Sequence, residues 1–142
     1  MDADAPRRLA QQYARYIDDR TFDRLAEIMA EDIQVGSPLF TCNSLAEFKE
    51  QLELLHNFRV TMHLVGNVFG EWTEGTYEGE AYCIAAHIYE KDGQEWKWEV
   101  GIRYQDRIVM RDRQALFTHR YLNVLWNLDQ PLVVPGGDYP GT

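Results

Sequence analysis

Four long β-rich runs occupy the second half of this 142-residue chain, and this feature most restricts how the chain can fold. The runs are separated by Glu-Gly, Lys-Asp-Gly and Arg-Asp-Arg turn sequences. Such turns favour reversals between antiparallel strands. The pattern predicts a meander of long strands, which would form a cone if they curve strongly. The runs cover residues 59–72, 76–90, 94–110 and 114–127.

The segment before these runs predicts helices. Apolar residues recur at helical spacing over residues 6–30, and a polar break falls at Asp18, Asp19 and Arg20. Two short helices or one bent helix therefore precede the sheet, and we expect Thr21 to cap the second piece with its hydroxyl. There follow, in order, a short strand at residues 31–37, a loop at 38–43, and a helix that Ser44 caps and that carries Leu45, Phe48, Leu52 and Leu55.

This order of elements predicts the fold class. Helices followed by strands favour an α+β domain in which the helices cover one face of a curved, mainly antiparallel sheet and enclose an apolar pocket. We expect one such cone-shaped domain at residues 1–127. Residues 128–142 hold three of the five prolines, so we expect an extended tail that wraps the surface or a neighbouring subunit.

The net charge and the lack of a targeting sequence restrict the expected binding partners and location of the protein. The formal net charge is −9 and no run of basic residues stands out, so attraction to nucleic acid or to an anionic membrane is unfavourable. The chain carries no apolar leader at its N-terminus and no stretch as long as a membrane span. We therefore expect a soluble cytoplasmic protein. Cys42 and Cys83 lack metal-site spacing, and we expect both to be free thiols.

His63 is the first candidate for chemistry. On a regular strand it shares a face with Thr61, Val65 and Asn67, which is a mixed polar and apolar row. A neutral imidazole there can remove a proton, and a carboxylate on its other ring nitrogen would support the charge that forms. Asp18, at the helix break, is the candidate carboxylate. In the structural alternative, His63 makes an ordinary hydrogen bond and Asp18 is a helix C-terminal turn residue or a solvated acid.

Two more strand positions are candidate ligand contacts. His87 shares a face with Ala81, Cys83 and Ala85, whose small side chains leave room for a ligand. It is either a second acid or base, or a histidine that donates to a neighbouring strand. Trp98 belongs to an apolar row that lines either the pocket or a subunit interface, and that comprises Trp96, Trp98, Val100, Ile102 and Tyr104.

The sequence also lacks the motifs of several enzyme classes. It contains no nucleophile-elbow serine, no glycine-rich loop after a strand, and no His, Cys or Asp cluster with metal-ligand spacing. A reaction without cofactor or metal remains. Proton abstraction beside an activating carbonyl needs one base, one orienting acid, and a donor to the developing oxyanion.

Three segments, YARYIDDRTFDRLAEIMAEDI, TMHLVGNVF and VGIRYQDRIVMRDRQALFTHR, resemble the SnoaL-like branch of the nuclear transport factor 2-like superfamily over about residues 7–127. The branch places an acid in an I-D-x-R-[DT]-[WF]-D-x-L stretch and opens its β-part with T-x-H-x-x-x-N. Here these motifs contain Asp18, His63 and Asn67. The usual D-G-x-W turn before the last strand is absent, since residues 111–115 read RDRQA.

The resemblance implies a chemistry. Dehydratase and dehydrochlorinase members use an Asp-supported His to abstract a proton and expel a leaving group, so Asp18 and His63 match that dyad. By position, Tyr13 matches a helix tyrosine and Arg120 a pocket arginine, and either would bind the oxygen that gains charge. Tyr13 and Asp18 lie about 140° apart on an ideal helix, so both point inward only if the chain turns near Asp18. From strand alternation, an internal Arg120 needs a carboxylate partner or an anionic ligand.

The function predicted from sequence is a cofactor-independent lyase of dehydratase type. Its substrate is expected to be small, apolar, and cyclic or polycyclic, with Asn67, His87 and Trp98 as further binding residues. Isomerisation or polyketide cyclisation with the same dyad is the alternative within enzymes. A non-catalytic domain that binds a small ligand or a partner is the alternative outside enzymes. By resemblance, a homodimer or homotrimer is expected.

Overall fold

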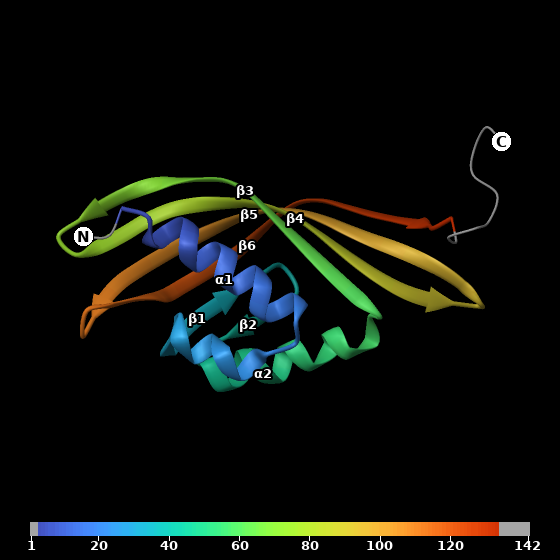
Figure 1. Ribbon diagram of the computed structural model, residues 1–142, viewed down its shortest axis with the longest axis horizontal. Helices are drawn as coiled ribbons and strands as arrows, with labels where there is room; N and C mark the ends of the chain where they lie inside the picture. The colour runs from blue at the N-terminus through green and yellow to red at the C-terminus, as the bar shows by residue number, and fades with distance from the viewer. Residues whose placement is uncertain (1–2, 134–142) are drawn as a thin grey trace.

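The computed structural model describes residues 3–133, in which six strands form one curved sheet in the order β2-β1-β6-β5-β4-β3 (Figure 1). All neighbouring strands are antiparallel except β1 and β6, which are parallel. Along the chain the elements are α1 (Ala5–Asp18), η1 (Phe22–Glu27), β1 (Met29–Gly36), β2 (Thr41–Cys42), α2 (Leu45–Leu52), η2 (Glu53–Asn57), β3 (Val60–Thr73), β4 (Thr76–Lys91), β5 (Gln94–Arg111) and β6 (Gln114–Pro131).

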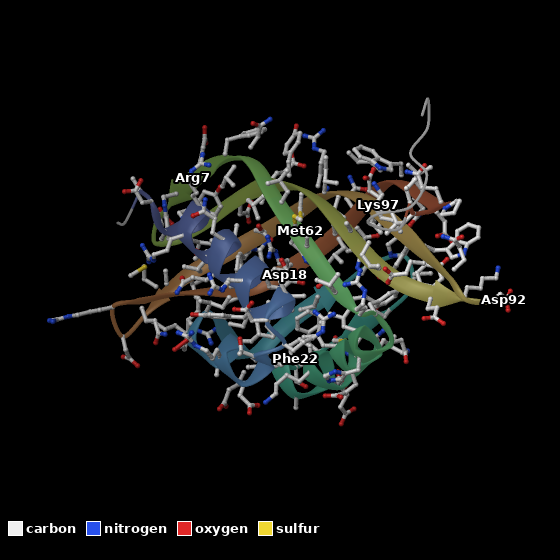
Figure 2. The ribbon with its side chains drawn as sticks, turned by 45° about the vertical axis from the view of Figure 1, so that its right-hand side comes forward. Arg7, Asp18, Phe22, Met62, Asp92 and Lys97 are labelled. Carbon is white, nitrogen blue, oxygen red and sulfur yellow. The ribbon has the colours of Figure 1, made fainter. Side chains whose placement is uncertain are left out.

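The helices lie on one face of this sheet, and the long strands bend over them (Figure 1). The two edge strands, β2 and β3, do not pair with each other, so the sheet is not closed. The tip of the β4–β5 hairpin at Asp92 extends away from the helices (Figure 2). This arrangement confirms the predicted α+β fold. No helix within residues 3–133 is both long and apolar enough to cross a membrane.

The end of α1 sets the position of Asp18. The amide of Thr21 donates to the Tyr16 carbonyl and the amide of Arg20 to that of Ile17, which is the Schellman pattern of a helix end. Arg20 takes the left-handed backbone at φ 60°, where glycine is usual. The predicted turn beside Asp18 is therefore confirmed, and Asp18 is the last helical residue.

The capping predictions have mixed outcomes. Ser44 caps α2, since its hydroxyl oxygen accepts the Glu47 amide at 3.1 Å. Thr21 precedes a short 3-10 helix, but its hydroxyl donates to the Tyr16 carbonyl at 3.5 Å and makes no cap, because the Schellman turn brings that carbonyl close.

The bounds of two elements differ from those predicted. The short strand β2 (Thr41–Cys42) lies in the segment expected to be a loop. β6 runs on to Pro131, beyond the predicted end of the domain, and residues 134–142 of the expected tail lie outside the described residues.

Three β-bulges interrupt the regular alternation where the long strands β3 to β6 pair with one another, and the register of β1 against β6 also shifts between Met29 and Gln34. One falls between Val65 and Val68 on β3, and the other two leave Thr118 and Leu125 on β6 without a partner on β5. A bulge adds one residue to one strand, so the side chains beyond it change face and the sheet twists more strongly. Sequence alternation therefore assigns the correct face only up to each bulge.

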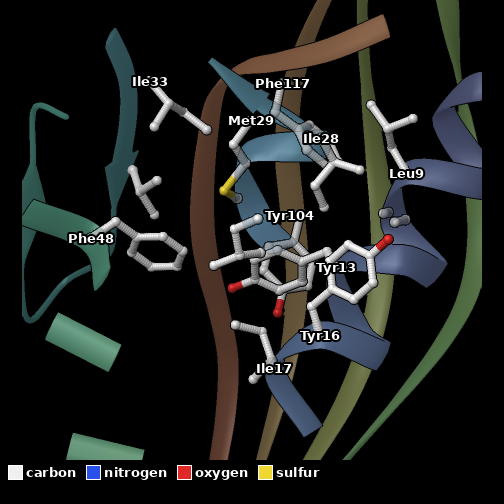
Figure 3. Packing of buried hydrophobic residues seen from close by; sticks show 14 of the residues in the cluster. Leu9, Tyr13, Tyr16, Ile17, Ile28, Met29, Ile33, Phe48, Tyr104 and Phe117 are labelled. Carbon is white, nitrogen blue, oxygen red and sulfur yellow. The ribbon is translucent and has the colours of Figure 1, made fainter. Parts of the chain in front are cut away.

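A core of aromatic and aliphatic side chains packs between the helices and the sheet (Figure 3). Leu9, Tyr13 and Ile17 recur on one stripe of α1 and are all buried. Phe48 of α2 stacks on Tyr13 with ring centroids 6.3 Å apart. This apolar burial is the main stabilising contribution to the fold, since each such side chain contributes about 1.5–3 kcal/mol when it leaves water.

Two glycines allow β3 and β4 to pack closely. Gly70 and Gly79 are direct cross-strand partners on β3 and β4, and the Tyr77 hydroxyl lies against both. A Cβ on Gly79 would come within 2.6 Å of the Phe69 carbonyl oxygen, which is backbone and cannot swing away. Only glycine fits there.

We predict that Gly79→Ala lowers the free energy of unfolding by about 1–3 kcal/mol, because the added methyl group overpacks the contact between the paired strands β3 and β4. Gly66→Ala is the matched control on β3, since its Cβ would lie at an ordinary 3.8 Å from Tyr82. Urea denaturation of both variants provides the measurement. Equal effects of the two substitutions would contradict the assigned packing.

Candidate active site

A pocket of about 770 Å³ opens between the helices and the concave face of the sheet. Its size falls in the range of small-molecule sites. Its lining is mostly apolar, and no Lys, Arg, Asp or Glu is among the described residues that line it. It therefore suits a neutral, largely apolar ligand. Its polar lining residues include Gln51, Asn57, His63, His87 and Asn127.

Asp18 and His63 form a direct pair at one wall of this pocket. His63 Nδ1 lies 2.7 Å from Asp18 Oδ1, and the His63 backbone amide donates to Asp18 Oδ2 at 2.9 Å. The His63 side chain is 7% exposed and that of Asp18 21%, so water is largely excluded from the contact. Figure 2 marks Asp18 at the end of α1, beside the strand that carries Met62.

Two further residues hold this pair in place. Thr61 donates its hydroxyl to Asp18 Oδ1 at 2.9 Å, and Arg20 donates to the Thr61 hydroxyl at 2.8 Å. Arg20 also donates to the carbonyl oxygens of Ile17 and Leu55, so it links α1, η2 and β3. These roles of Thr61 and Arg20 were not predicted, although Thr61 shares the strand face of His63 and Arg20 is part of the helix motif.

The protonation of the pair follows from its contacts. Burial by itself raises the pKa of Asp18, but hydrogen bonds from the His63 ring, the His63 amide and Thr61 outweigh it, and the pKa lies below its ordinary value. The carboxylate is thus ionised and accepts only. His63 Nδ1 must therefore carry a proton, and in the neutral ring Nε2 is left with a lone pair. This is the tautomer that a general base requires.

Tyr13 lies next to His63 in the pocket wall, with the two rings edge to face and their centroids 6.5 Å apart. Burial raises the pKa of the Tyr13 phenol to about 12, although nearby Arg120 and a hydrogen bond with Tyr104 lower it in part. Tyr13 is therefore a neutral phenol that can donate a hydrogen bond.

Arg120 does not line the pocket, in contrast to the role that the resemblance implies for it. Its guanidinium is 1% exposed and donates to Asp106 at 2.8 Å from Nε. It also lies over the ring of Tyr104 at 3.7 Å and that of Tyr13 at 4.3 Å. Burial of a cation requires such compensation. The carboxylate partner expected for an internal Arg120 is thus present, and the guanidinium packs against the rings of Tyr13 and Tyr104, which line the pocket.

His87 and Trp98 both line the pocket, as expected of binding residues. His87 Nδ1 lies 3.1 Å from the Trp98 carbonyl oxygen, which is the sheet hydrogen bond of the structural alternative. The His87 ring lies 6.0 Å from that of His63. Desolvation lowers the pKa of His87 to about 4, so its ring is neutral near pH 7. Trp98 belongs to the apolar row that was expected to line either a pocket or an interface, and it lines the pocket.

Asn67 is not brought to the pocket. The bulge after Val65 adds a residue to β3, so Asn67 points to the outer face, where it lines a shallow hollow with Leu64 and Tyr82. The opposite change occurs on β6, where the bulge at Leu125 turns Trp126 outward and Asn127 into the pocket. Asn127 was not predicted as a pocket residue, because a single extra residue leaves no signal in a strand pattern.

Neither a metal site nor a disulfide is evident among residues 3–133. No group of three or more His, Cys, Asp and Glu side chains in that range could hold a metal ion. Cys42 and Cys83 are buried free thiols, which confirms that prediction. Burial raises the pKa of Cys83 to about 11, so it is an unreactive thiol.

Comparison with known proteins identifies the family. A family model described as the SnoaL-like domain matches residues 2–121. The chain belongs to the SnoaL-like domain family. This membership confirms the family predicted from the three sequence segments. No curated protein matches the sequence.

Solved structures share this SnoaL-like fold at low sequence identity. Kfla4162 from Kribbella flavida is 17% identical with a TM-score of 0.78, covering 89% of this chain and 95% of its own. A putative scytalone dehydratase from Novosphingobium aromaticivorans is 24% identical at 0.77, covering 97% and 92%. A type 2 hexachlorocyclohexane dehydrochlorinase, LinA, is 17% identical at 0.77, covering 94% and 90%. These likenesses establish the NTF2-like fold.

The buried ion pair of Arg120 and Asp106 allows a prediction about the stability of the fold. Arg120→Met leaves Asp106 buried without its partner, so we expect the free energy of unfolding to fall by about 3–5 kcal/mol. The double variant Arg120→Met/Asp106→Leu removes both charges and should recover most of that loss. Guanidinium denaturation measures each value. A single variant with nearly unchanged stability would show that the guanidinium is not a buried partner.

The depressed pKa of His87 predicts acid sensitivity. Between its ordinary value of 6.5 and its folded value of about 4, the unfolded chain binds a proton that the folded protein excludes. Stability therefore falls as the pH drops through this window, by up to about 3 kcal/mol from His87. His87→Gln cannot titrate but keeps a donor for the Trp98 carbonyl.

Comparison of the two proteins isolates this contribution from all other titrating groups. Urea denaturation at about pH 7 and about pH 4.5 gives the difference in unfolding free energy between wild type and His87→Gln. We expect the unfolding free energy of the wild type, relative to that of His87→Gln, to be lower at the acidic pH than at neutral pH. An identical loss in both proteins would rule out His87 as the source.

Proposed function

We propose that this protein is a cofactor-independent lyase of dehydratase type. His63 Nε2 takes a proton from a carbon beside an electron-withdrawing group of an apolar, cyclic substrate, and water departs. The observation that carries this proposal is the 2.7 Å contact between His63 Nδ1 and Asp18 in the wall of an apolar pocket. In the neutral ring, this contact leaves Nε2 as the nitrogen with the free lone pair.

Each residue has one task in the proposed reaction. Asp18 orients the imidazole and stabilises its positive charge after proton transfer. The phenol of Tyr13 donates to the carbonyl oxygen as this oxygen gains charge. The electrons of the broken C–H bond form the new C=C bond as the C–O bond breaks. The proton on His63 Nε2 is passed to the departing hydroxyl, which leaves as water, and the base is regenerated.

Tyr13 is a better oxygen-binding group than Arg120. It lines the pocket beside His63, whereas Arg120 is held by Asp106 under the aromatic side chains. The Arg120 cation lies 4.3 Å over the Tyr13 ring and lowers the pKa of the phenol against the effect of burial. Arg120 thus acts through Tyr13.

The names of two similar structures support elimination as the reaction class. One is a putative scytalone dehydratase and another a hexachlorocyclohexane dehydrochlorinase, so both names denote loss of a small group. Isomerisation or cyclisation would use the same base and differ only in where the proton goes. A non-catalytic binding domain would need only the Asp18 bonds to Thr61 and to the His63 amide, which hold α1 on β3, and not the contact with the His63 ring that fixes its tautomer.

The test uses a panel of cyclic β-hydroxy ketones, with products identified by mass spectrometry. We expect loss of one water from at least one member, and His63→Ala should slow it by about 10²–10⁴-fold. Asp18→Asn should slow it by at least about tenfold, because the amide cannot stabilise the imidazolium. His119→Ala, a histidine outside the pocket, is the matched control and should keep the wild-type rate.

A second assay does not depend on the leaving group. Ketones of the same panel without the hydroxyl are incubated in D₂O, where proton abstraction appears as deuterium uptake beside the carbonyl. Uptake that requires His63 without loss of water from any hydroxy ketone would replace elimination by isomerase-type chemistry. No turnover and no uptake that depends on His63 would favour the binding domain.

We also infer a homodimer or homotrimer. The outer face of the sheet carries apolar side chains that are exposed in the single chain, among them Met62 at 65%, Leu64 at 64% and Leu125 at 50%. An apolar patch of this kind is typical of protein interfaces. The small-molecule pocket lies on the opposite face, so self-association through the outer face leaves it open.

A further inference from the structure

Trp98 forms hydrogen bonds with two polar residues of the pocket, His87 and Asn127, and in each bond the direction of donation is fixed. Its backbone carbonyl oxygen lies 3.1 Å from His87 Nδ1, and its indole Nε1 donates to Asn127 Oδ1 at 3.0 Å. A carbonyl oxygen can only accept, and an indole N–H can only donate. Both partners of Trp98 are therefore restricted to one orientation.

The orientation of each partner determines what it offers a ligand. His87 must carry its proton on Nδ1, so in the neutral ring Nε2 is a hydrogen-bond acceptor. Asn127 must turn its carbonyl oxygen to the indole, so its NH₂ group is left as a donor. The pocket thus contains an acceptor on β4 and a donor on β6, with Trp98 of β5 between them.

The sheet register places these groups in one region of the pocket. His87 is the direct cross-strand partner of Trp98, and Asn127 is the partner of Val100, the next inward residue on β5. The His87 ring lies 4.5 Å from the Trp98 ring and 5.1 Å from that of Phe58, so it has little freedom to turn. The same ring is 6.0 Å from His63.

We propose that Trp98 is a positioning residue that makes the pocket select a neutral ligand with two polar groups on an apolar ring. A hydroxyl of the ligand donates to His87 Nε2, and a carbonyl of the ligand accepts from Asn127 Nδ2. The absence of charged side chains from the described pocket lining excludes a compensated ionic group. This inference deepens the proposed function, because it states the polar pattern of the substrate, but the binding itself does not require His63.

The test measures binding of acetylnaphthols, whose ring system is apolar and whose fluorescence responds to the environment. Positional isomers are compared with their methyl ethers, which lack the donor, and with the ethylnaphthols, which lack the acceptor. We expect at least one isomer to bind the wild-type protein about threefold to tenfold more tightly than either analogue. If no isomer gains affinity from either group, the proposal is wrong.

Substitution of Trp98 separates the two halves of the recognition. Trp98→Phe removes the indole N–H but keeps the backbone carbonyl, so the preference for the carbonyl group should vanish while that for the hydroxyl persists. Asn127→Asp, a matched change that keeps an acceptor for the indole but removes the donor, should have the same effect. His87→Phe should abolish only the preference for the hydroxyl.

A double variant excludes a merely structural effect of Trp98. In an Asn127→Leu background, Trp98→Phe should leave the ratio of affinities between each acetylnaphthol and its ethyl analogue unchanged relative to Asn127→Leu, because the indole then has no amide to orient. A loss of carbonyl preference that is additive in the two variants would overturn the positioning role. The pattern is also measured in His63→Ala, where it should persist. If the wild-type protein shows no preference for the hydroxyl and carbonyl groups, this inference is wrong. If it shows that preference but eliminates water from no hydroxy ketone, only the proposed elimination is wrong.

Discussion

The carboxylate of Asp18 joins the first helix to the edge of the sheet, and the candidate site depends on this junction. It accepts hydrogen bonds from the Thr61 hydroxyl, the His63 amide and the His63 ring. β3 is an edge strand, so its amides on that side have no strand partner and are free for this contact. The same bonds that fix α1 on β3 also orient the imidazole of His63. Docking of the helix and preparation of the base are thus one interaction.

Charged and neutral polar groups occupy different parts of the interior. The Arg120 and Asp106 pair is almost completely buried and lies below the rings of Tyr13 and Tyr104. Neutral polar groups line the pocket above these rings. A full charge in the pocket wall would be costly unless a partner accompanied it. This order keeps the pocket neutral and lets a buried cation act on the Tyr13 phenol through the ring.

Local patterns were reliable for the end of α1 and for the cap of α2, but not for Thr21, whose hydroxyl bonds to the Tyr16 carbonyl instead of capping η1. Helical spacing and the polar break predicted the end of α1, and Ser44 caps its helix as expected. Strand alternation placed Trp98 in the correct row, but it failed for Asn67 and could not find Asn127, since each lies just past a bulge. A bulge depends on how two strands pair, and a single strand does not contain that information.

The amino-acid sequence by itself determined the α+β fold class, the SnoaL-like family and the pair of residues that could act as acid and base, because periodicity, turn residues and short motifs are local properties. Only the tertiary structure decided which groups face the pocket. It paired Arg120 with Asp106, turned Asn67 outward and Asn127 inward, and restricted His87 and Asn127 through Trp98. These outcomes depend on strand register and on contacts between residues far apart in the chain, where burial leaves each polar atom only the partner that the fold brings to it.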